Sequence, residues 1–221
     1  MARLINIKFS VNLLRIITRK QQIKVLHIDS SLQGNKSTSS KIAQKLIDKL
    51  DVNNNTNSEI LYRDLNADVI PHLTEEKFTA FNTPEAERTL QQQEAVAISD
   101  KLIDEVSHSD VLIIGVPMYN LGVPSTLKAW FDHLARAGKT FTYTAEGPKP
   151  LLKMPKVYII ATRGGMYANT PADTQSPWLK QILHFIGVNE INFIYAEGAA
   201  MNSADDVFSN AERQISQLLS A

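Results

Sequence analysis

The sequence contains no cysteine. This absence excludes disulfide bonds, cysteine-bound zinc, iron–sulfur clusters and thiol catalysis. The 23 basic and 23 acidic side chains balance to a formal net charge of zero, so the chain lacks the basic surface typical of nucleic-acid-binding proteins. Its longest apolar runs are of strand length, well short of the roughly 20 residues that span a bilayer. We therefore expect a cytoplasmic protein with no transmembrane segment, no nucleic-acid partner and a small-molecule ligand.

Several common catalytic and binding motifs are also missing. The five histidines show no spacing typical of a metal site, so no metal is expected. The sequence has no Gly-x-Ser-x-Gly motif and no Gly-x-Gly-x-x-Gly motif, which argues against a serine hydrolase and a dinucleotide fingerprint. Gly138-Lys139-Thr140 resembles the end of a nucleotide P-loop, but it follows a predicted helix and lacks the first glycine.

The chain of 221 residues, 43% of them hydrophobic, suits one domain with a full core. Residues 1–22 stand apart because they carry basic side chains and no acidic one. This extension is either a dispensable arm, including a start assigned too far upstream, or an organelle-targeting or membrane-surface segment. We expect residues 23–221 to form the functional domain.

From residue 23 onward, strand-like and helix-like patterns alternate. Apolar residues at helical spacing separate the strands and predict five helices, the third opened by Pro124 and the last capped by Ser203. Residues 66–91 show no clear period and are predicted to be a long functional loop. Alternation of this kind favours an α/β fold with a parallel sheet covered on both faces. The predicted strands are residues 23–29, 59–62, 110–115, 156–161 and 191–195.

Hydroxyl groups are dense after the first predicted strand, where a helix begins. They belong to Ser31, Ser37, Thr38 and Ser39. A helix N-terminus offers free N–H groups and the positive end of the helix dipole, both of which suit a phosphate. Serine and threonine are also ordinary helix caps, but a cap needs only one hydroxyl. The cluster therefore favours a phosphate site, and the missing dinucleotide motif favours a mononucleotide such as FMN.

The third predicted strand ends in Gly-Val-Pro and continues into Met118, Tyr119 and Asn120. Such an end exposes backbone N–H and C=O groups beside an aromatic ring and a carboxamide. These groups suit the edge of an isoalloxazine ring, although proline and asparagine are also common turn residues. Ligands of doubly wound sheets bind at the carboxyl ends of the strands, so the position itself supports a binding site.

The fourth predicted strand is followed by Thr162, Arg163, Gly164 and Gly165. Two glycines allow the backbone to approach a flat ring closely, and their N–H groups can donate to the ring edge where charge develops on reduction. They are equally compatible with a simple turn. Arg163 either adds positive charge at that edge or is a solvated loop arginine.

Phe141 and Tyr143 alternate in a polar segment that precedes a predicted turn at Glu146-Gly147-Pro148. This excursion either presents an aromatic side chain over a bound ring or packs its aromatic side chains into the interior.

Taken together, these motifs resemble the bacterial azoreductase family of FMN-dependent NADH:quinone and azo-compound oxidoreductases, which has a flavodoxin-like fold. The likeness extends from about Lys24 to the C-terminus. It implies a doubly wound five-stranded parallel sheet of order 2-1-3-4-5 with helices on both faces. Beyond the three loops above, it includes Ala135-Arg136-Ala137-Gly138, Thr140-Phe141, Phe185-Ile186-Gly187 and Ala196-Glu197-Gly198.

The resemblance implies a tightly bound FMN and a homodimer whose two active sites lie at the subunit interface. Tyr143 and Phe185 would lie near the substrate. Leu121 stands where the family often has phenylalanine, which makes substrate preference the open point. The implied cofactor contacts are the phosphate at Ser31, Ser37, Thr38 and Ser39, and the ring at Met118, Tyr119, Asn120, Leu121, Thr162, Arg163, Gly164 and Gly165.

The resulting hypothesis is a ping-pong reaction in which NADH, or alternatively NADPH, supplies two electrons to bound FMN. A quinone then accepts them, or an azo compound is cleaved to amines. This chemistry belongs to the cofactor, which agrees with the lack of a catalytic dyad in the sequence. The alternative is a flavodoxin-like electron carrier or a regulatory flavin subunit of a partner protein.

Overall fold

The computed structural model describes residues 22–54 and 58–220. All but the last residue of the predicted N-terminal extension lie outside the described residues. Five strands form a parallel sheet. They are β1 (Lys24–Asp29), β2 (Glu59–Asp64), β3 (Val111–Pro117), β6 (Lys156–Thr162) and β7 (Ile191–Ala196).

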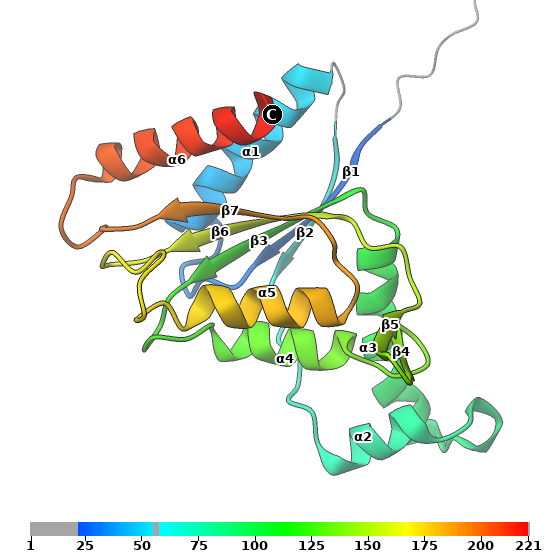
Figure 1. The fold of residues 1–221 in the computed structure, drawn as a ribbon. Coiled ribbons are helices and arrows are strands. Elements are labelled where there is room, and N and C mark those ends of the chain that lie inside the picture. The colour runs from blue at the N-terminus through cyan, green and yellow to red at the C-terminus, as the bar shows by residue number, and fades with distance from the viewer. Residues whose placement is uncertain (1–21, 55–57, 221) are drawn as a thin grey trace, which may run out of the picture.

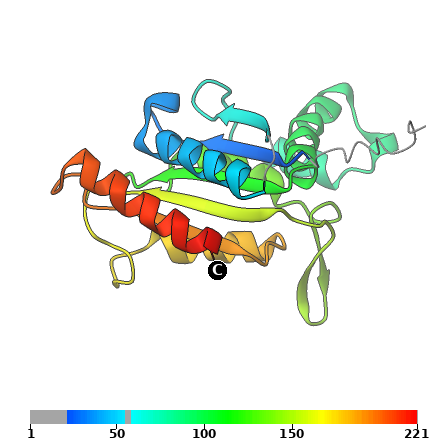
Figure 2. The same cartoon turned by 90° about the horizontal axis from the view of Figure 1, so that it is seen from above.

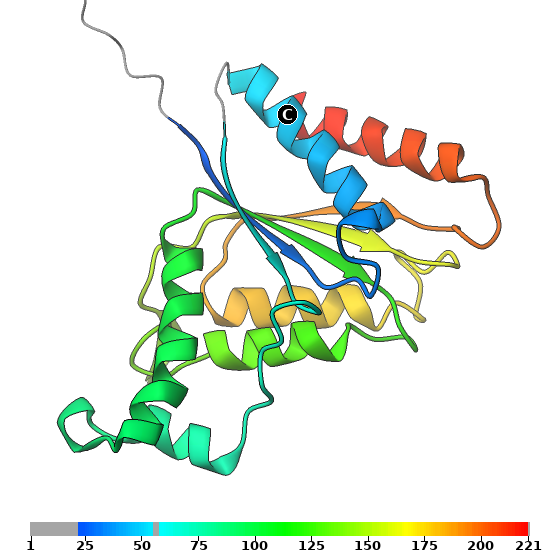
Figure 3. The same cartoon turned by 180° about the vertical axis from the view of Figure 1, so that it is seen from behind.

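Six α-helices connect and cover these strands in the described part of the chain. Helices α1 and α6 cover one face of the sheet, and α3, α4 and α5 pack against the other (Figures 1 and 3). Parallel strands require crossover connections, so this three-layer arrangement follows from the alternation in the sequence. The helices are α1 (Thr38–Asn54), α2 (Glu75–Asn82), α3 (Leu90–Ser107), α4 (Ser125–Leu134), α5 (Gln175–Phe185) and α6 (Ala204–Ser220).

The order of the sheet is β2-β1-β3-β6-β7. The five predicted strands are the five of this sheet, and the predicted order 2-1-3-4-5 differs from the observed one only in numbering, because the described chain forms two further strands. The additional strands β4 (Phe141–Thr144) and β5 (Gly147–Pro150) pair with each other as an antiparallel hairpin outside the sheet. The predicted turn at Glu146-Gly147-Pro148 lies at this hairpin, which projects beside the main body in Figure 2.

The segment 66–91 is not the single structureless loop that its sequence predicted. It contains α2, whose N-terminal turn is capped by the Thr74 hydroxyl accepting a hydrogen bond from the Lys77 N–H, and a short 3₁₀ turn at Glu85–Glu87. Only Ala80 of α2 is buried. A helix of eight residues with one buried side chain leaves almost no apolar periodicity in the sequence, so the pattern could not reveal it.

The sheet divides the hydrophobic core into two layers. Alternate residues of each strand point to opposite faces, so Leu26 and Ile28 pack with α3, α4 and α5, while Val25 packs with α1 and α6. Strand β3 is buried along its whole length, as expected for the central strand of a covered sheet. These two layers make the sheet a rigid base, and the loops at its edge are where a site can form.

Two helices begin where the sequence predicted, α4 after Pro124 and α6 after Ser203. Helix α4 begins one residue after Pro124, and α5 begins at Gln175 and ends two residues before Gly187. Gly187 has a φ of +100°, and a Cβ atom there would lie 2.3 Å from Cβ of Pro150, so the end of α5 packs against the hairpin. Among the residues that the structure describes, no helix is both long and apolar enough to cross a membrane.

Candidate functional site

The register of the parallel strands brings the predicted loops to one edge of the sheet. Asp29, the last residue of β1, pairs with Asp64 of β2 and Gly115 of β3. Farther along the sheet, Pro117 pairs with Thr162, the last residue of β6. The chain leaves β1 for β2 on one side and reaches β3 on the other, which is the topological switch point where doubly wound sheets bind ligands.

Hydroxyl groups gather at the N-terminus of α1. The side chains of Ser31, Ser37 and Ser39 belong to buried residues, and Thr38 is partly buried. The Oγ atoms of Ser37 and Ser39 lie 3.0 Å apart, and Oγ of Ser37 also accepts a hydrogen bond of 3.1 Å from the N–H of Ser40. The first turn of α1 carries no acidic side chain. The predicted phosphate loop is therefore compact, rich in donors and placed at the positive end of a helix of 17 residues.

A buried carboxylate, that of Asp29, holds this loop in place. Asp29 accepts hydrogen bonds from the N–H of Ser31 at 2.9 Å, from the hydroxyl of Ser40, and from the phenol of Tyr62 at 3.1 Å. Burial, together with the Asp29 carboxylate and its hydrogen bond, raises the pKa of Tyr62, so the phenol stays a neutral donor. Asp29 thus joins this loop, the first turn of α1 and β2 through three hydrogen-bond donors.

A two-residue turn follows β3. Asn120 and Leu121 have φ values of +50° and +65°, in the left-handed region that residues with a Cβ rarely adopt. Tyr119 and Gly122 close the turn with reciprocal backbone hydrogen bonds of 3.1 and 3.0 Å. Asn120 is exposed and the side chain of Leu121 is 55% exposed, so both project from the sheet edge. Met118 and Tyr119 behind them are partly buried.

Hydrogen bonds connect the loops after β1, β2 and β3. The phenol oxygen of Tyr119 accepts from the N–H of Leu32 at 3.2 Å, and the carboxamide of Asn66 donates to the carbonyl of Ser31. The three loops border a cavity of about 590 Å³. It is lined by Leu32, Asn66, Met118, Tyr119, Asn120, Val123, Pro124, Ser125 and Thr126.

The loop after β6 joins the same edge through the backbone. The N–H of Met118 donates to the carbonyl of Thr162 at 2.9 Å, which fixes this loop beside the β3 turn. Gly164 and Gly165 are accessible, and a Cβ atom on Gly165 would lie 3.0 Å from the ring of Tyr167. The absent side chain therefore leaves room for the tyrosine.

The side chain of Arg163 is completely buried, so its prediction as a solvated loop arginine is wrong. Its guanidinium donates to both carboxylate oxygens of Asp173 at 3.1 Å and to Glu197 at 3.0 Å. It also donates to Gln175 and Ser176 at 3.2 and 2.7 Å. Five hydrogen bonds thus occupy this guanidinium. It holds the loop after β6, the start of α5 and the residues after β7 in place.

The Asp173 carboxyl has a lowered pKa. Burial by itself would raise this pKa, but hydrogen bonds from the backbone and side chain of Ser176 and from Arg163 outweigh burial. Asp173 is consequently an ionised partner for the buried arginine. The Glu197 carboxylate also accepts from the N–H groups of Tyr167 and Ala168, both at 2.9 Å, so it anchors the continuation of the β6 loop.

Within one chain, the structure does not bring Tyr143 and Phe185 to the other predicted site residues. Tyr143 lies in β4 and is 70% exposed, and Phe185 is the last residue of α5. Phe141 joins them, with its ring 5.2 Å from Tyr143 and 4.4 Å from Phe185 between centroids. The hairpin and the end of α5 lie at the amino ends of the strands, opposite the arrowheads of the sheet (Figures 1 and 2).

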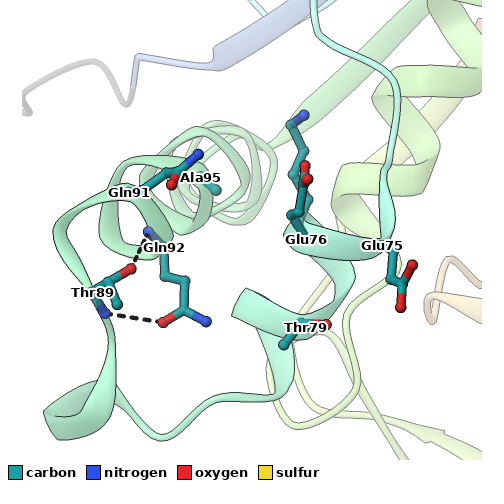
Figure 4. A pocket seen from close by; sticks show the side chains of 8 residues that line it. Glu75, Glu76, Thr79, Thr89, Gln91, Gln92 and Ala95 are labelled. Atoms are coloured by element: carbon teal, nitrogen blue, oxygen red, sulfur yellow. Dashed lines mark hydrogen bonds between the residues drawn. The ribbon is translucent and has the colours of Figure 1, made fainter.

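A second hollow lies away from this edge, between α2 and α3 (Figure 4). Its volume is about 440 Å³, and Thr89 and Gln92 in its wall form the capping box that starts α3. These two side chains satisfy each other's backbone groups within the helix end. It is lined by Glu75, Glu76, Lys77, Thr79, Thr89, Gln91, Gln92 and Ala95.

Sequence reasoning missed several residues that shape the site. Asn66 follows β2, and its position after a strand was the available signal, because all carboxyl ends of a parallel sheet lie at one edge. Asp29 ends β1 and could have been noticed for the same reason. Thr174 and Gln175 contact the β3 turn from the start of α5, and nothing in their local sequence indicates this.

We expect Gly115→Ala to destabilise the protein by about 1–3 kcal/mol, as overpacking of a filled interior does. A Cβ atom at this position in β3 would lie 3.0 Å from Oγ and 3.1 Å from Cβ of Ser39, pressing on the start of α1. Gly122→Ala is the matched control, because its Cβ would meet only the carbonyl oxygen of Tyr119, at 3.8 Å. Thermal unfolding measures both, and equal midpoints for the two variants would contradict the expected contact.

A doubly wound parallel sheet, with a hydroxyl-rich helix start and two further loops at its switch point, defines a flavodoxin-like α/β protein. Comparison with known proteins agrees, since the family model described as flavodoxin-like fold matches residues 23–219. An FMN-dependent NADH:quinone oxidoreductase of Cellvibrio japonicus (strain Ueda107) is 45% identical over 197 residues, covering 89% of this chain and 98% of the relative. The relative of the same name from Dechloromonas aromatica (strain RCB) is 44% identical over 199 residues, covering 89% and 100%.

The chain therefore belongs to the flavodoxin-like fold family and, within it, to the FMN-dependent NADH:quinone oxidoreductases. Among solved structures, an FMN-dependent NADH-azoreductase from Bacillus anthracis str. Ames Ancestor, in complex with FMN, superimposes with a TM-score of 0.79. That chain is 23% identical, and the match covers 89% of this chain and 98% of the azoreductase. The resemblance inferred from the separated motifs is confirmed at the level of the family, and this structural likeness supports the fold.

Proposed function

We propose that this protein binds FMN and catalyses the NADH-dependent two-electron reduction of quinones, with NADPH as a second donor and azo compounds as further substrates. The observation that carries the proposal is the convergence of three loops, after β1, β3 and β6, at one edge of the sheet. The relatives that carry the corresponding name cover nearly the whole described domain at 44–45% identity, which supports the same activity here. Neither the names nor the site favours an electron carrier.

The hydroxyl-rich start of α1 fits the phosphate of FMN. Ser31, Ser37, Thr38 and Ser39 would hold it, assisted by N–H groups of the first helical turn, which have no partner within a helix. The hydroxyl oxygens of Ser37 and Ser39 lie 3.0 Å apart, close enough for both hydroxyls to donate to one bound phosphate. This donor set suits a dianion, and the Asp29 carboxylate is already occupied by three donors of its own.

The isoalloxazine ring would lie between the two other loops. Met118, Tyr119, Asn120 and Leu121 would contact one edge, and the backbone of Thr162, Arg163, Gly164 and Gly165 the other. We assign Arg163 a backbone contact only, because its guanidinium is fully used within the protein. The cavity of about 590 Å³ beside Met118 and Asn120 offers space at this edge.

When bound, FMN supplies two-electron transfer, accepting a hydride equivalent from NADH and returning two electrons to the acceptor. The protein would hold the ring edge against the backbone groups of the β3 and β6 loops. The Gly164 and Gly165 N–H groups would donate to the ring edge where negative charge develops, which is where preorganised donors are most effective. A site that receives NADH and the quinone in turn would give ping-pong kinetics.

We further propose a homodimer. Tyr143 and Phe185 lie at the end of the sheet opposite the loops, so in one chain they are too far from the ring to contact a substrate there. In a dimer, the hairpin and the end of α5 of one copy would contribute these aromatic side chains to the active site of the other. The exposure of Tyr143, at 70%, is consistent with a side chain that has its partner in a second subunit.

The test of the function is an absorption spectrum of freshly purified protein, followed by titration with NADH and then with a quinone. We expect flavin bands in the visible region, their bleaching by NADH without any partner protein, and their return when the quinone is added. A protein that binds no FMN, or whose flavin NADH fails to bleach, would refute the proposal.

Asn120 offers a sharper test of the ring contact, through two variants that separate the carboxamide from the backbone. Because Asn120 has a φ of +50°, Asn120→Gly keeps the turn and removes only the carboxamide, whereas Asn120→Ala also strains the backbone. We expect the rate of flavin reduction by NADH to fall about tenfold in both, as the loss of one well-placed hydrogen bond would cause. Normal reduction in Asn120→Gly would mean that the residue serves only the turn.

A further inference from the structure

The turn at Asn120–Leu121 needs support from elsewhere in the protein. Two consecutive residues with side chains have positive φ values, a combination for which glycine and asparagine are the usual residues. The reciprocal backbone bonds between Tyr119 and Gly122 close the turn but do not fix its position against the sheet edge. The turn is also exposed, so core packing does not hold it.

The support comes from the first residues of α5. The side-chain amide of Gln175, a residue only 1% exposed, donates to the carbonyls of Pro117 and Gly122, both at 3.1 Å. The hydroxyl of Thr174 donates to the carbonyl of Leu121. Thr174 and Gln175 thus bind three backbone carbonyls before, within and after the turn. These two residues lie more than 50 positions after the turn in the sequence.

Arg163 determines which way the Gln175 amide faces. Its Nε–H donates to the amide oxygen at 3.2 Å, and an arginine N–H can only donate. The amide nitrogen must then point to the turn, where it finds two acceptors. Since Arg163 follows β6 and is fixed by Asp173 and Glu197, the same buried contacts hold both loops between which the ring would lie.

We propose that Gln175 is a positioning residue that holds the Asn120–Leu121 turn at the flavin edge, with Arg163 setting the orientation of its amide. The proposal rests on the function proposed above. Gln175 is buried behind the turn and acts on the ring through the backbone of Pro117 and Gly122. Losing its amide would let the turn shift, and small misplacements of a reacting group have large effects on rate.

The test compares Gln175→Leu with Gln214→Leu. Gln214 is the matched control because its side-chain amide also makes two bonds to backbone, accepting from the N–H of Tyr195 at 2.9 Å and donating to its carbonyl at 2.8 Å. It lies in α6, on the other side of the sheet from α5. Three quantities are measured for each variant: the thermal midpoint, the Kd for FMN by fluorescence quenching, and the rate of flavin reduction at saturating NADH.

We expect both variants to lose stability, but only Gln175→Leu to raise the Kd for FMN, by about tenfold, and to slow reduction by a similar factor, as loss of two hydrogen bonds implies. Thr174→Val, which removes one exposed donor and keeps the shape, should change both quantities about threefold in the same direction. Wild-type values in Gln175→Leu, or equal flavin effects in Gln214→Leu, would overturn the proposal.

If Gln175→Leu fails to fold, Thr174→Val decides, and wild-type flavin binding and reduction in that variant would overturn the assignment. A wild-type protein that binds no FMN would instead refute the proposed function, and the inference with it. The two failures are therefore distinguishable by measuring the wild type first.

Discussion

Replacing Arg163 with methionine is expected to lower the free energy of unfolding by about 3–5 kcal/mol, the range found when one partner of a buried ion pair is removed. Methionine fills much of the same space but cannot donate, so the carboxylates of Asp173 and Glu197 would remain buried without a cation. The wild-type arginine donates to these two residues at 3.0–3.1 Å from a side chain with no exposed surface. Urea unfolding, followed by fluorescence, measures the difference.

The stability difference between wild type and Arg163→Met should depend on pH. The folded-state pKa of Asp173 lies below its ordinary value, so its contribution to stability is present above the unfolded pKa of about 3.9 and is lost as pH falls through the folded value. In Arg163→Met, Asp173 loses its cation and takes up a proton more readily in the folded state. The difference in stability between wild type and variant should therefore shrink as pH falls from 7 toward 4.

A matched control is available in β2, the first strand in the order of the sheet. Arg63 of β2 is also buried, at 8% exposure, and its guanidinium binds Glu105 and Asp68. Arg63→Met should lose stability as well, but its Kd for FMN should stay at the wild-type value, whereas Arg163→Met should bind FMN more weakly. A loss below about 1 kcal/mol in Arg163→Met would show that the ion pairs are dispensable, as in surface pairs.

The sheet and its covering helices were predictable because their signals are local. Val111–Pro117 is apolar throughout, and α1 has apolar residues at helical spacing, so each pattern identifies its own element. The pairing of β4 with β5 was not predicted, because only β4 shows an alternation, at Phe141 and Tyr143, whereas β5 (Gly-Pro-Lys-Pro) contains two prolines and no apolar alternation. The alternation of predicted strands with predicted helices also indicated the class of fold, because parallel strands require crossover connections.

The phosphate loop could be predicted for the same reason, because a helix start and its hydroxyls are neighbours in the sequence. The surroundings of Arg163 could not. Its partners lie 10 to 34 positions away, before and at the start of α5 and after β7, and only the folded chain brings them together. An arginine beside two glycines is typical of an exposed loop. The burial of Arg163 depends on carboxylates that no sequence motif marks.

Ser37→Ala combined with Ser39→Ala is expected to raise the Kd for FMN by about 10- to 100-fold, as loss of hydrogen bonds to a charged group implies. The two hydroxyls lie 3.0 Å apart at the positive end of α1, the point at which a phosphate would gain most from both. Because Ser37 also accepts from the N–H of Ser40, the double variant should lose about 1 kcal/mol of stability as a missing helix cap does.

Two comparisons separate the phosphate contact from the cap. Ser203→Ala removes the equivalent contact at the start of α6, where the hydroxyl accepts from the N–H of Asp206 at 3.2 Å, and should leave the Kd for FMN unchanged. Riboflavin has the same ring but no phosphate, so its affinity should differ little between wild type and the double variant. If the double variant lost affinity for riboflavin and FMN equally, the serines would be shaping the ring site, and the phosphate would have to lie elsewhere.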